Sequence, residues 1–485
     1  MKRNNSKNMH FLKILSLSLL ALVPLSKRVA EKPNVVLIFI DDMGYGDLSC
    51  YGALFHTPQI DRMAADGMRF TQFYSAQGVC SASRAALMTG CYPNRIGIHG
   101  ALFPASTNGI HENEKTMGEL FKEAGYATAI YGKWHLGHHT PFLPLQHGFD
   151  EYVGIPYSND MWPVDFSGAP VTDPKQNKGW YPVLPLIEGN TVAKEIRTLT
   201  DQDSLTSLYT EKAVDFIRRN RKKPFFLYLP HSMVHIPLGV SEKFRGKSGW
   251  SMYADVVQEV DWSVGQILAT LKELKLDDNT IVVFTSDNGP WQNFGDHAGS
   301  AAGLREAKGS SFEGGVRVPC IVRWPGNIPA GNVCNRLATT MDLFPTLAEI
   351  CGGKLPSHPI DGVTIRSLWN GDQEAEPRKT FYYYYQRNSL EAVRDRRWKL
   401  VLPHKFVSYA PLPGNGGFPG STVTDSTGLA LYDLYRDPGE RYDVQALYPE
   451  VVKNLLQTAE EARNELGDDL TKRTGSGVRP SGQLK

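Results

Sequence analysis

Apolar runs rich in β-branched and aromatic residues alternate along the chain with longer stretches of helical periodicity. Between these runs, segments such as 207–220 and 253–274 place apolar residues three and four positions apart, which predicts amphipathic helices. Strands that alternate with helices indicate an α/β fold with a mostly parallel central sheet flanked by helices. Four runs predict buried strands: NVVLIFI (34–40), YATAIYG (126–132), PFFLYLP (224–230) and TIVVFTS (280–286).

Each of the four predicted strands runs directly into polar side chains. Because ligands bind beyond the carboxyl ends of the strands in open α/β sheets, we expect these residues to share one cleft. Taken singly, a lysine is more often solvated surface and a histidine an ordinary satisfied side chain. In chain order the residues are Asp41 and Asp42, Lys133 and His135, His231 and His235, and Asp287 and Asn288.

The two acidic pairs favour a metal site. Asp41, Asp42 and Asp287 offer three carboxylates and Asn288 an amide oxygen, and this donor set suits a hard divalent cation such as Ca²⁺. Each pair alone has a structural alternative, because Asp-Asp after a strand can cap a helix and Asp-Asn-Gly is a common turn. A zinc site is less favoured, since the cysteines lack zinc-type spacing and the histidines are not paired four residues apart on a predicted helix.

The segment VCSASRAALMTG (79–90) places Cys80 where a helix is predicted to begin and Gly90 where it ends. A helix N-terminus lowers the pKa of a thiol, so a nucleophilic cysteine is one interpretation and a buried structural cysteine is the other. The chain has six cysteines, widely spread, which is unlike a small scaffold held together by disulfides.

The motif around Cys80, CSASR followed by LMTG, resembles the signature of type I sulfatases in the alkaline-phosphatase-like superfamily. Other matching stretches follow in order: PNVVLIFIDDMGYGDLSCYG, GYATAIYGKWHLG, HSMVHIP, TSDNG, KGSSFEGGVRVPCIVRWPG and LYDLYRDPGE. The resemblance implies that Cys80 is oxidised to formylglycine (3-oxoalanine) by a formylglycine-generating enzyme. It implies Ca²⁺ ligands at Asp41, Asp42, residue 80, Asp287 and Asn288, and catalytic roles for Arg84, Lys133, His135, His235 and Lys308.

The implied chemistry explains the need for an aldehyde. A hydrated aldehyde at residue 80 carries a second hydroxyl, which can collapse and expel sulfate, whereas a serine would remain sulfated. By family analogy, Arg84 holds the hydrate and His135 orients or deprotonates it. His235, together with Lys308, would protonate the leaving alkoxide, which a sugar needs because its alcohol leaves poorly.

The leading functional hypothesis is calcium-dependent hydrolysis of sulfate esters on carbohydrates, such as galactose or N-acetylgalactosamine sulfates of polysaccharides. It rests on the resemblance, which is nearest to bacterial relatives of the sulfatases that act on those sugars. Hydrolysis of phosphonate monoesters or phosphodiesters, which superfamily relatives perform with the same formylglycine, is the alternative. A member that only binds sulfated glycans is disfavoured, because every expected polar position is filled. Position 82 is alanine, where many members of the family have proline, so more than one type of enzyme is a candidate for the oxidation of Cys80.

The pattern changes after the polar stretch 368–379. We expect a catalytic domain over residues 31–375 and a smaller domain over 376–485, made of an antiparallel sheet, a helix and a disordered tail from 471. The Gly- and Pro-rich segment 403–425 is expected to form a loop over the cleft. Two weaker candidates for substrate contact are His404 in this loop, for which a surface role is equally open, and His297.

Residues 1–30 combine basic residues with the apolar run FLKILSLSLLALVPL, which predicts a signal peptide. The protein is then secreted or periplasmic and has no stable membrane span after cleavage; an uncleaved anchor is the alternative. The 52 basic and 51 acidic residues nearly balance, and no basic cluster follows the N-terminus. Nucleic acid is therefore not expected as a partner.

Overall fold

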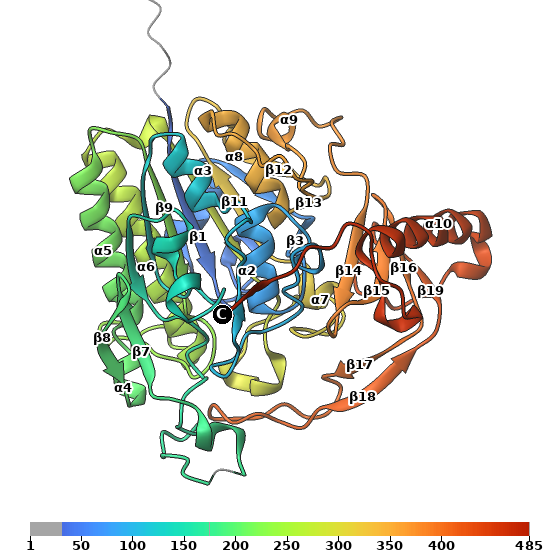
Figure 1. Cartoon of the computed structure of the whole chain (residues 1–485), viewed down its shortest axis with the longest axis horizontal. Helices are drawn as coiled ribbons and strands as arrows, with labels where there is room; N and C mark the ends of the chain where they lie inside the picture. The colour runs from blue at the N-terminus through green and yellow to red at the C-terminus, as the bar shows by residue number, and fades with distance from the viewer. Residues whose placement is uncertain (1–31, 174, 485) are drawn as a thin grey trace, which may run out of the picture. The chain divides into compact units, whose positions relative to one another are not determined.

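The centre of the fold is a ten-stranded mixed sheet in the computed structural model, which describes residues 32–173 and 175–484 (Figure 1). The predicted signal peptide lies outside these residues. Across the sheet the strands are β12 (Asn332–Cys334), β2 (Met68–Phe70), β11 (Cys320–Arg323), β10 (Thr280–Ser286), β1 (Asn34–Ile40), β9 (Phe225–His231), β5 (Ala127–Tyr131), β6 (Glu151–Gly154), β7 (Leu184–Glu188) and β8 (Thr191–Ile196).

The four strands predicted from the apolar runs are β1, β5, β9 and β10, and they are consecutive neighbours in the order β10, β1, β9, β5. They pair in parallel, and β6 extends the parallel part beyond β5. Their carboxyl ends therefore lie at one edge of the sheet. The outer strands β11, β7 and β8 pair antiparallel, which makes the sheet mixed while its centre is parallel as predicted.

Helices cover both faces of this sheet (Figure 1). Every residue of β1 is buried, and alternate residues pack into two different cores: Ile38 and Ile40 into one, Leu37 and Phe39 into the other. This double burial explains the continuous apolar run. The first core includes α1 (Pro58–Ala65), α5 (Leu205–Asn220) and α6 (Met252–Glu273), and the second includes α2 (Cys80–Thr89), α3 (Met117–Glu123) and α8 (Leu343–Cys351).

The C-terminal region forms a four-stranded antiparallel sheet with a helix, as predicted. Buried Glu313, which lies before this sheet in sequence, ties it to the rest of the fold: it accepts hydrogen bonds from the hydroxyls of Tyr74 (2.6 Å) and Tyr383 (2.8 Å). Residues 32–484 form one compact unit. The elements are β14 (Phe381–Tyr385), β15 (Ser389–Arg394), β16 (Trp398–Val401), β19 (Ala430–Asp433) and α10 (Pro449–Leu466).

Two segments expected to be irregular are more ordered than their composition indicates. The ends of segment 403–425 form an antiparallel ribbon of β17 (His404–Ser408) and β18 (Val423–Thr427). The disorder predicted from residue 471 onward is wrong: β20 (Gly482–Gln483) pairs with β4 (Asn108–Gly109), and Arg479 Nε lies 2.6 Å from Glu114 Oε1. Backbone pairing and this ion pair with a buried carboxylate hold the tail in place.

The remaining elements are short. Within the described ranges, no helix has the length and apolarity needed to cross a bilayer. The short helices are α4 (Leu199–Gln202), α7 (Glu313–Val316) and α9 (Arg366–Trp369), and β3 (Phe73–Tyr74) pairs with β13 (Ala338–Thr339).

Candidate active site

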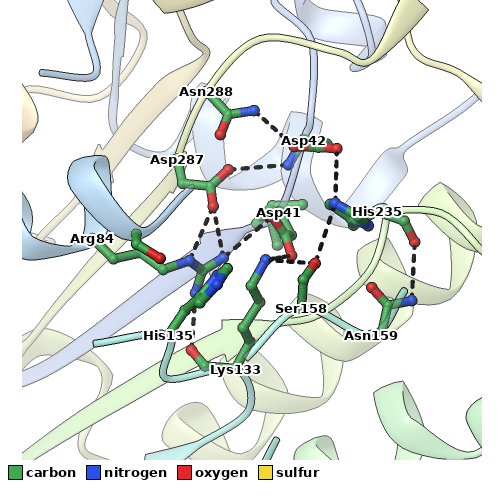
Figure 2. Close-up of polar contacts among 12 residues, drawn as sticks. Asp41, Asp42, Arg84, Lys133, His135, Ser158, Asn159, His235, Asp287 and Asn288 are labelled. Atoms are coloured by element: carbon green, nitrogen blue, oxygen red, sulfur yellow. Dashed lines mark hydrogen bonds and ion pairs between the residues drawn. The ribbon is translucent and has the colours of Figure 1, made fainter. Parts of the chain in front are cut away.

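Four oxygen-bearing side chains meet where β1 and β10 end. The two strands are paired up to their last residues, so Asp41 and Asp42 after β1 lie beside Asp287 and Asn288 after β10 (Figure 2). Asp42 has a left-handed backbone (φ 60°), which is uncommon for a residue other than glycine. One oxygen from each of the three carboxylates lies within 4.8 Å of the others, and all three side chains are buried.

The cluster has the free donor atoms that a hard cation requires. Oδ1 of Asp41 and Oδ1 of Asn288 are buried, and neither has a hydrogen-bond partner in the described part of the chain. The Asn288 amide nitrogen donates to Asp42 Oδ1 at 2.7 Å, which fixes its amide oxygen on the opposite side. Carboxylate and amide oxygens are the ligands that Ca²⁺ prefers, so these residues fit a bound calcium ion.

The negative charges of the Asp41 and Asp287 carboxylates lie close together in this cluster. Burial and the negative charge of Asp41 raise the pKa of Asp287 to about 7. Burial alone would also raise the pKa of Asp41, but the charges of Lys133, His235 and Arg84 outweigh it and hold that pKa well below its usual range. A divalent cation at this place would offset the repulsion between the carboxylates.

Two buried cations connect the acidic cluster to neighbouring elements (Figure 2). Arg84, one turn into α2, donates through Nε and Nη2 to Asp287 Oδ2 at 3.0 and 2.8 Å, and through Nη1 to the carbonyl of Lys133 at 2.9 Å. Nζ of Lys133 lies 2.5 Å from Asp41 Oδ2 and donates to Ser158 Oγ at 3.1 Å. Both cations are therefore held in place by several contacts.

Lys308 supplies a third cation from the segment that follows β10. Its Nζ lies 2.7 Å from Asp42 Oδ1 and 4.4 Å from the centre of the Trp291 ring, and the Tyr409 hydroxyl donates to its carbonyl at 2.6 Å. Burial would lower the pKa of Lys308, but the Asp42 carboxylate raises it above its usual range. The Asp42 carboxylate therefore favours the charged form of Lys308.

Cys80 is the first residue of α2 and is 3% exposed. It lines a pocket of about 440 Å³ together with Ser158, His235, Trp291 and Lys308. Burial raises the pKa of its thiol, despite the nearby lysines. A thiol with a raised pKa is a poor nucleophile, so an ordinary nucleophilic cysteine is disfavoured here.

In each of two histidines, one ring nitrogen lies beside a backbone carbonyl. Nδ1 of His235 lies 2.5 Å from the carbonyl of Ile236, and its Nε2 lies 3.2 Å from Ser158 Oγ. Nε2 of His135 lies 2.8 Å from the carbonyl of Leu102, while its buried Nδ1 has no partner among the residues described. Burial and the charges of nearby lysines lower the pKa of both rings.

Of the five histidines named from the sequence, His235 lines the Cys80 pocket, whereas His135, close to Lys133 in sequence, is fully buried off the lining and the other three also lie off it. Nε2 of His231 lies 3.1 Å from Ser263 Oγ, in the core on one face of the sheet. His297 lines a separate cavity of about 470 Å³. His404 is buried, with Nδ1 2.7 Å from the carbonyl of Leu402, so substrate contact by His297 or His404 lacks support.

Sequence reasoning missed the opposite wall of the pocket. Ser158 and Asp160 follow β6, whose short sequence EYVG within GFDEYVGIPYSND (148–160) was the one local signal for a further strand end. The other missed residues come from loops and from the C-terminal sheet, and no local motif marks them. They include His99, Phe103, Trp291, Tyr385, Arg387 and Tyr409.

The mixed sheet, parallel at its centre, with buried carboxylates and cations at its strand ends, has the alkaline-phosphatase-like fold of solved sulfatase structures. Comparison of the chain with known protein families identifies the family within this fold class. Residues 33–353 match the Sulfatase family model, 307–410 the C-terminal model of N-sulphoglucosamine sulphohydrolase, and 376–484 the C-terminal region of aryl-sulfatase. The chain belongs to the sulfatase family and is a sulfuric ester hydrolase.

Similar proteins extend over nearly the whole chain. Human arylsulfatase A is 37% identical over 458 residues, which is 91% of this chain and 89% of that protein. N-acetylgalactosamine-6-sulfatase from Mus musculus is 38% identical over 479 residues, 93% of this chain and 90% of that protein. Among solved structures, PsFucS1 sulfatase from Pseudoalteromonas sp. is similar with a TM-score of 0.79 and 27% identity, covering 89% of this chain and 90% of that one.

Proposed function

We propose that this chain hydrolyses sulfate esters of carbohydrates, with galactose or N-acetylgalactosamine units as the sugar class. The observation that carries the proposal is the position of Cys80, buried at the start of α2 in a pocket that also contains His235 and Lys308. The N-acetylgalactosamine-6-sulfatases among its relatives support the choice of sugar. So does the 31% identical structure described under the metabolism of multiple glycosaminoglycans by Bacteroides thetaiotaomicron.

The reaction is proposed to depend on two groups that this chain would acquire. Cys80 would be converted to formylglycine, and Ca²⁺ would be held by Asp41, Asp42, Asp287, Asn288 and the converted residue 80. The hydrated aldehyde supplies a nucleophilic oxygen that can later release sulfate, and the calcium ion offsets negative charge on that oxygen and on the sulfate.

Three buried cations would act in the reaction, one on the residue-80 side chain and two on the sulfate group. Arg84, fixed by Asp287, lies one helical turn after Cys80 on the same face of α2 and would position the residue-80 side chain. Lys133 and Lys308 would offset the charge that grows on the sulfate oxygens. Fixed charges in a buried site do this without reorganising solvent, and this is usually the largest catalytic contribution.

The two histidines would divide the proton transfers. His135 keeps a proton on Nε2 for the Leu102 carbonyl and has a free lone pair on Nδ1, so it would accept a proton from the nucleophile. With Nδ1 donating to the Ile236 carbonyl, His235 would act as an acid only when a second proton is on Nε2, which lies 3.6 Å from Asp42 Oδ2 at the pocket. The lowered pKa makes that protonated ring a stronger acid. It would protonate the departing sugar oxygen, with Lys308 beside it.

Export and maturation complete the proposal. Residues 1–30 would direct the chain to the periplasm or out of the cell, and a formylglycine-generating enzyme would convert Cys80 before the chain folds.

The experiment that tests the proposed function measures sulfate release from a panel of galactose, N-acetylgalactosamine and glucosamine sulfates. It uses protein produced together with a formylglycine-generating enzyme, with Cys80→Ala as the control.

We expect release from one regioisomer by the converted protein and none by the control. Peptide mass measurement around residue 80 verifies the conversion. Preference for phosphonate monoesters or phosphodiesters over every sulfate ester, with conversion verified, would overturn the proposal and select the alternative enzyme class.

A further inference from the structure

One wall of the Cys80 pocket comes from the turn between β14 and β15, far from the strand ends in sequence. Tyr385, Gln386 and Arg387 of this turn line the pocket. Gln386 (φ 43°) and Arg387 (φ 70°) both have left-handed backbones, a conformation that residues other than glycine rarely adopt. Strained backbone of this kind persists where surrounding contacts hold it, and it is concentrated at ligand sites.

Contacts on both sides of the turn hold it in that conformation. The Asn388 side chain donates to the carbonyl of Leu466 at the end of α10 (2.8 Å), and the Asp469 amide donates to the Asn388 carbonyl (2.9 Å). From the other side, Asn94 Nδ2 donates to the carbonyl of Arg387 (3.4 Å). The backbone that carries the Arg387 side chain is therefore fixed relative to the pocket.

The charge on Arg387 differs from the other charges that line the pocket. Lys308 is paired with Asp42, whereas the Arg387 guanidinium forms no hydrogen bond or ion pair within residues 32–173 and 175–484. Asp160 is the carboxylate on the pocket lining; it makes no ion pair with Arg387, and its buried Oδ1 has no partner among the described atoms. A pocket of about 440 Å³ lies in the range of about 300–1,000 Å³ that suits small ligands.

We propose that Arg387 binds a second anionic group of the substrate, a carboxylate or a further sulfate, while the sulfate that is removed lies at Cys80 and Lys308. A guanidinium presents a planar set of donors that matches either anion with two parallel hydrogen bonds. Asp160, on the same lining, accepts hydroxyl hydrogens of the sugar ring between the two anions. The inference rests on the proposed function and narrows its substrates to sugars with at least two negative charges.

The test compares three substrates with the Arg387→Ala variant and the converted wild-type protein. The substrates are N-acetylgalactosamine 6-sulfate, the corresponding 4,6-disulfate, and a 6-sulfated disaccharide that contains a uronic acid. We expect kcat/KM for a doubly charged substrate to fall about tenfold or more relative to the monosulfate, mainly through KM, because a charge-assisted hydrogen bond is lost. The substrate with the larger fall identifies the anion as sulfate or carboxylate.

Two further variants separate a specific contact from a general loss of charge. Arg387→Lys keeps the charge but not the paired donors, so it is expected to restore part of the preference. Arg221→Ala removes the same charge from the exposed end of α5 and is the matched control. An equal fall on all three substrates in Arg387→Ala, or the same change in preference in Arg221→Ala, would overturn the proposal.

A binding measurement separates this proposal from the proposed function. The Cys80→Ala protein, which cannot turn over, is titrated calorimetrically with the disulfate and with the uronic acid disaccharide. Binding of either that weakens about tenfold in Cys80→Ala/Arg387→Ala supports the contact, even if the wild-type protein releases no sulfate from the panel. Unchanged affinity for both ligands in that double variant refutes it.

Discussion

Nζ of Lys133 lies 2.5 Å from Oδ2 of Asp41, and both side chains are fully buried. The same ammonium donates to Ser158 Oγ, whose other neighbour is Nε2 of His235, so one lysine connects the acidic cluster to the proposed acid (Figure 2). Asp41 is one of the three clustered carboxylates, so this ion pair links the cluster to the strand end of β5.

Replacing Lys133 by alanine is expected to lower kcat by about 10²–10³, because a preorganised charge aimed at the reacting group is lost. Steady-state kinetics on a responsive sulfate ester measure this. Lys122→Ala is the control, since Lys122 is half exposed and forms a surface ion pair with Asp150. Similar kcat values for the two variants would contradict a catalytic position for Lys133.

Removing calcium is expected to lower both activity and the melting temperature, because a ligand bound only to the folded state stabilises it by mass action. Calorimetry with a chelator, and then with excess Ca²⁺, measures the difference. Asn288→Ala removes the free amide oxygen of the cluster and is expected to reduce the calcium-dependent shift. Asn113→Ala, at an exposed position, is expected to behave as wild type. Equal melting temperatures with and without Ca²⁺ would contradict the metal site.

Glu391 makes stability depend on pH. Burial raises its pKa from 4.5 to about 8, so the folded chain holds this proton more tightly than the unfolded chain does. The resulting stability is fully present below about pH 4.5 and is lost as the pH rises toward 8. Glu391→Gln is therefore expected to flatten the fall in melting temperature between pH 5 and 8, a range set by this shift. Glu450→Gln, at an exposed site, provides the comparison, and parallel curves for all three proteins would disprove the assignment.

The C-terminal tail supports one wall of the pocket. Its strand β20 pairs with β4, within the loop that also carries His99 and Phe103 into the pocket, and Arg479 pairs with Glu114. A chain that ends at residue 475 is expected to show faster amide hydrogen exchange over residues 97–110 and a raised KM, with kcat less affected. Unchanged exchange in that loop would show that the tail does not support it.

The parallel centre of the sheet was predictable because strands buried on both faces are nearly continuous apolar runs. The polar residues beside it followed from their position after those strands. β6 is short, and Ser158 lies four residues beyond its end, so the same rule did not reach it. Arg387 reaches the pocket because of how the C-terminal sheet packs on Glu313 and its neighbours, and no local pattern encodes that packing.

The C-terminal tail and the ribbon of β17 and β18 are more ordered in the structure than their sequences predict. Composition predicts irregular chain for both, yet strand pairing orders them: the tail pairs with β4, which is distant in sequence, and the two ends of segment 403–425 pair with each other as β17 and β18. Composition describes the local preference of a segment, whereas the order of these two segments comes from backbone pairing between residues that are not adjacent in the chain.

The burial of Cys80 sets an order of events during synthesis. Its side chain is enclosed by residues that leave the ribosome much later, including Lys308, and by an edge of the sheet that needs β10 to be complete. Any enzyme that oxidises this thiol must therefore reach it while the chain is still open. If Cys80 is converted as proposed, folding of the region from β10 to Lys308 would compete with that conversion, and a slower-folding variant would yield a larger converted fraction than a faster-folding one.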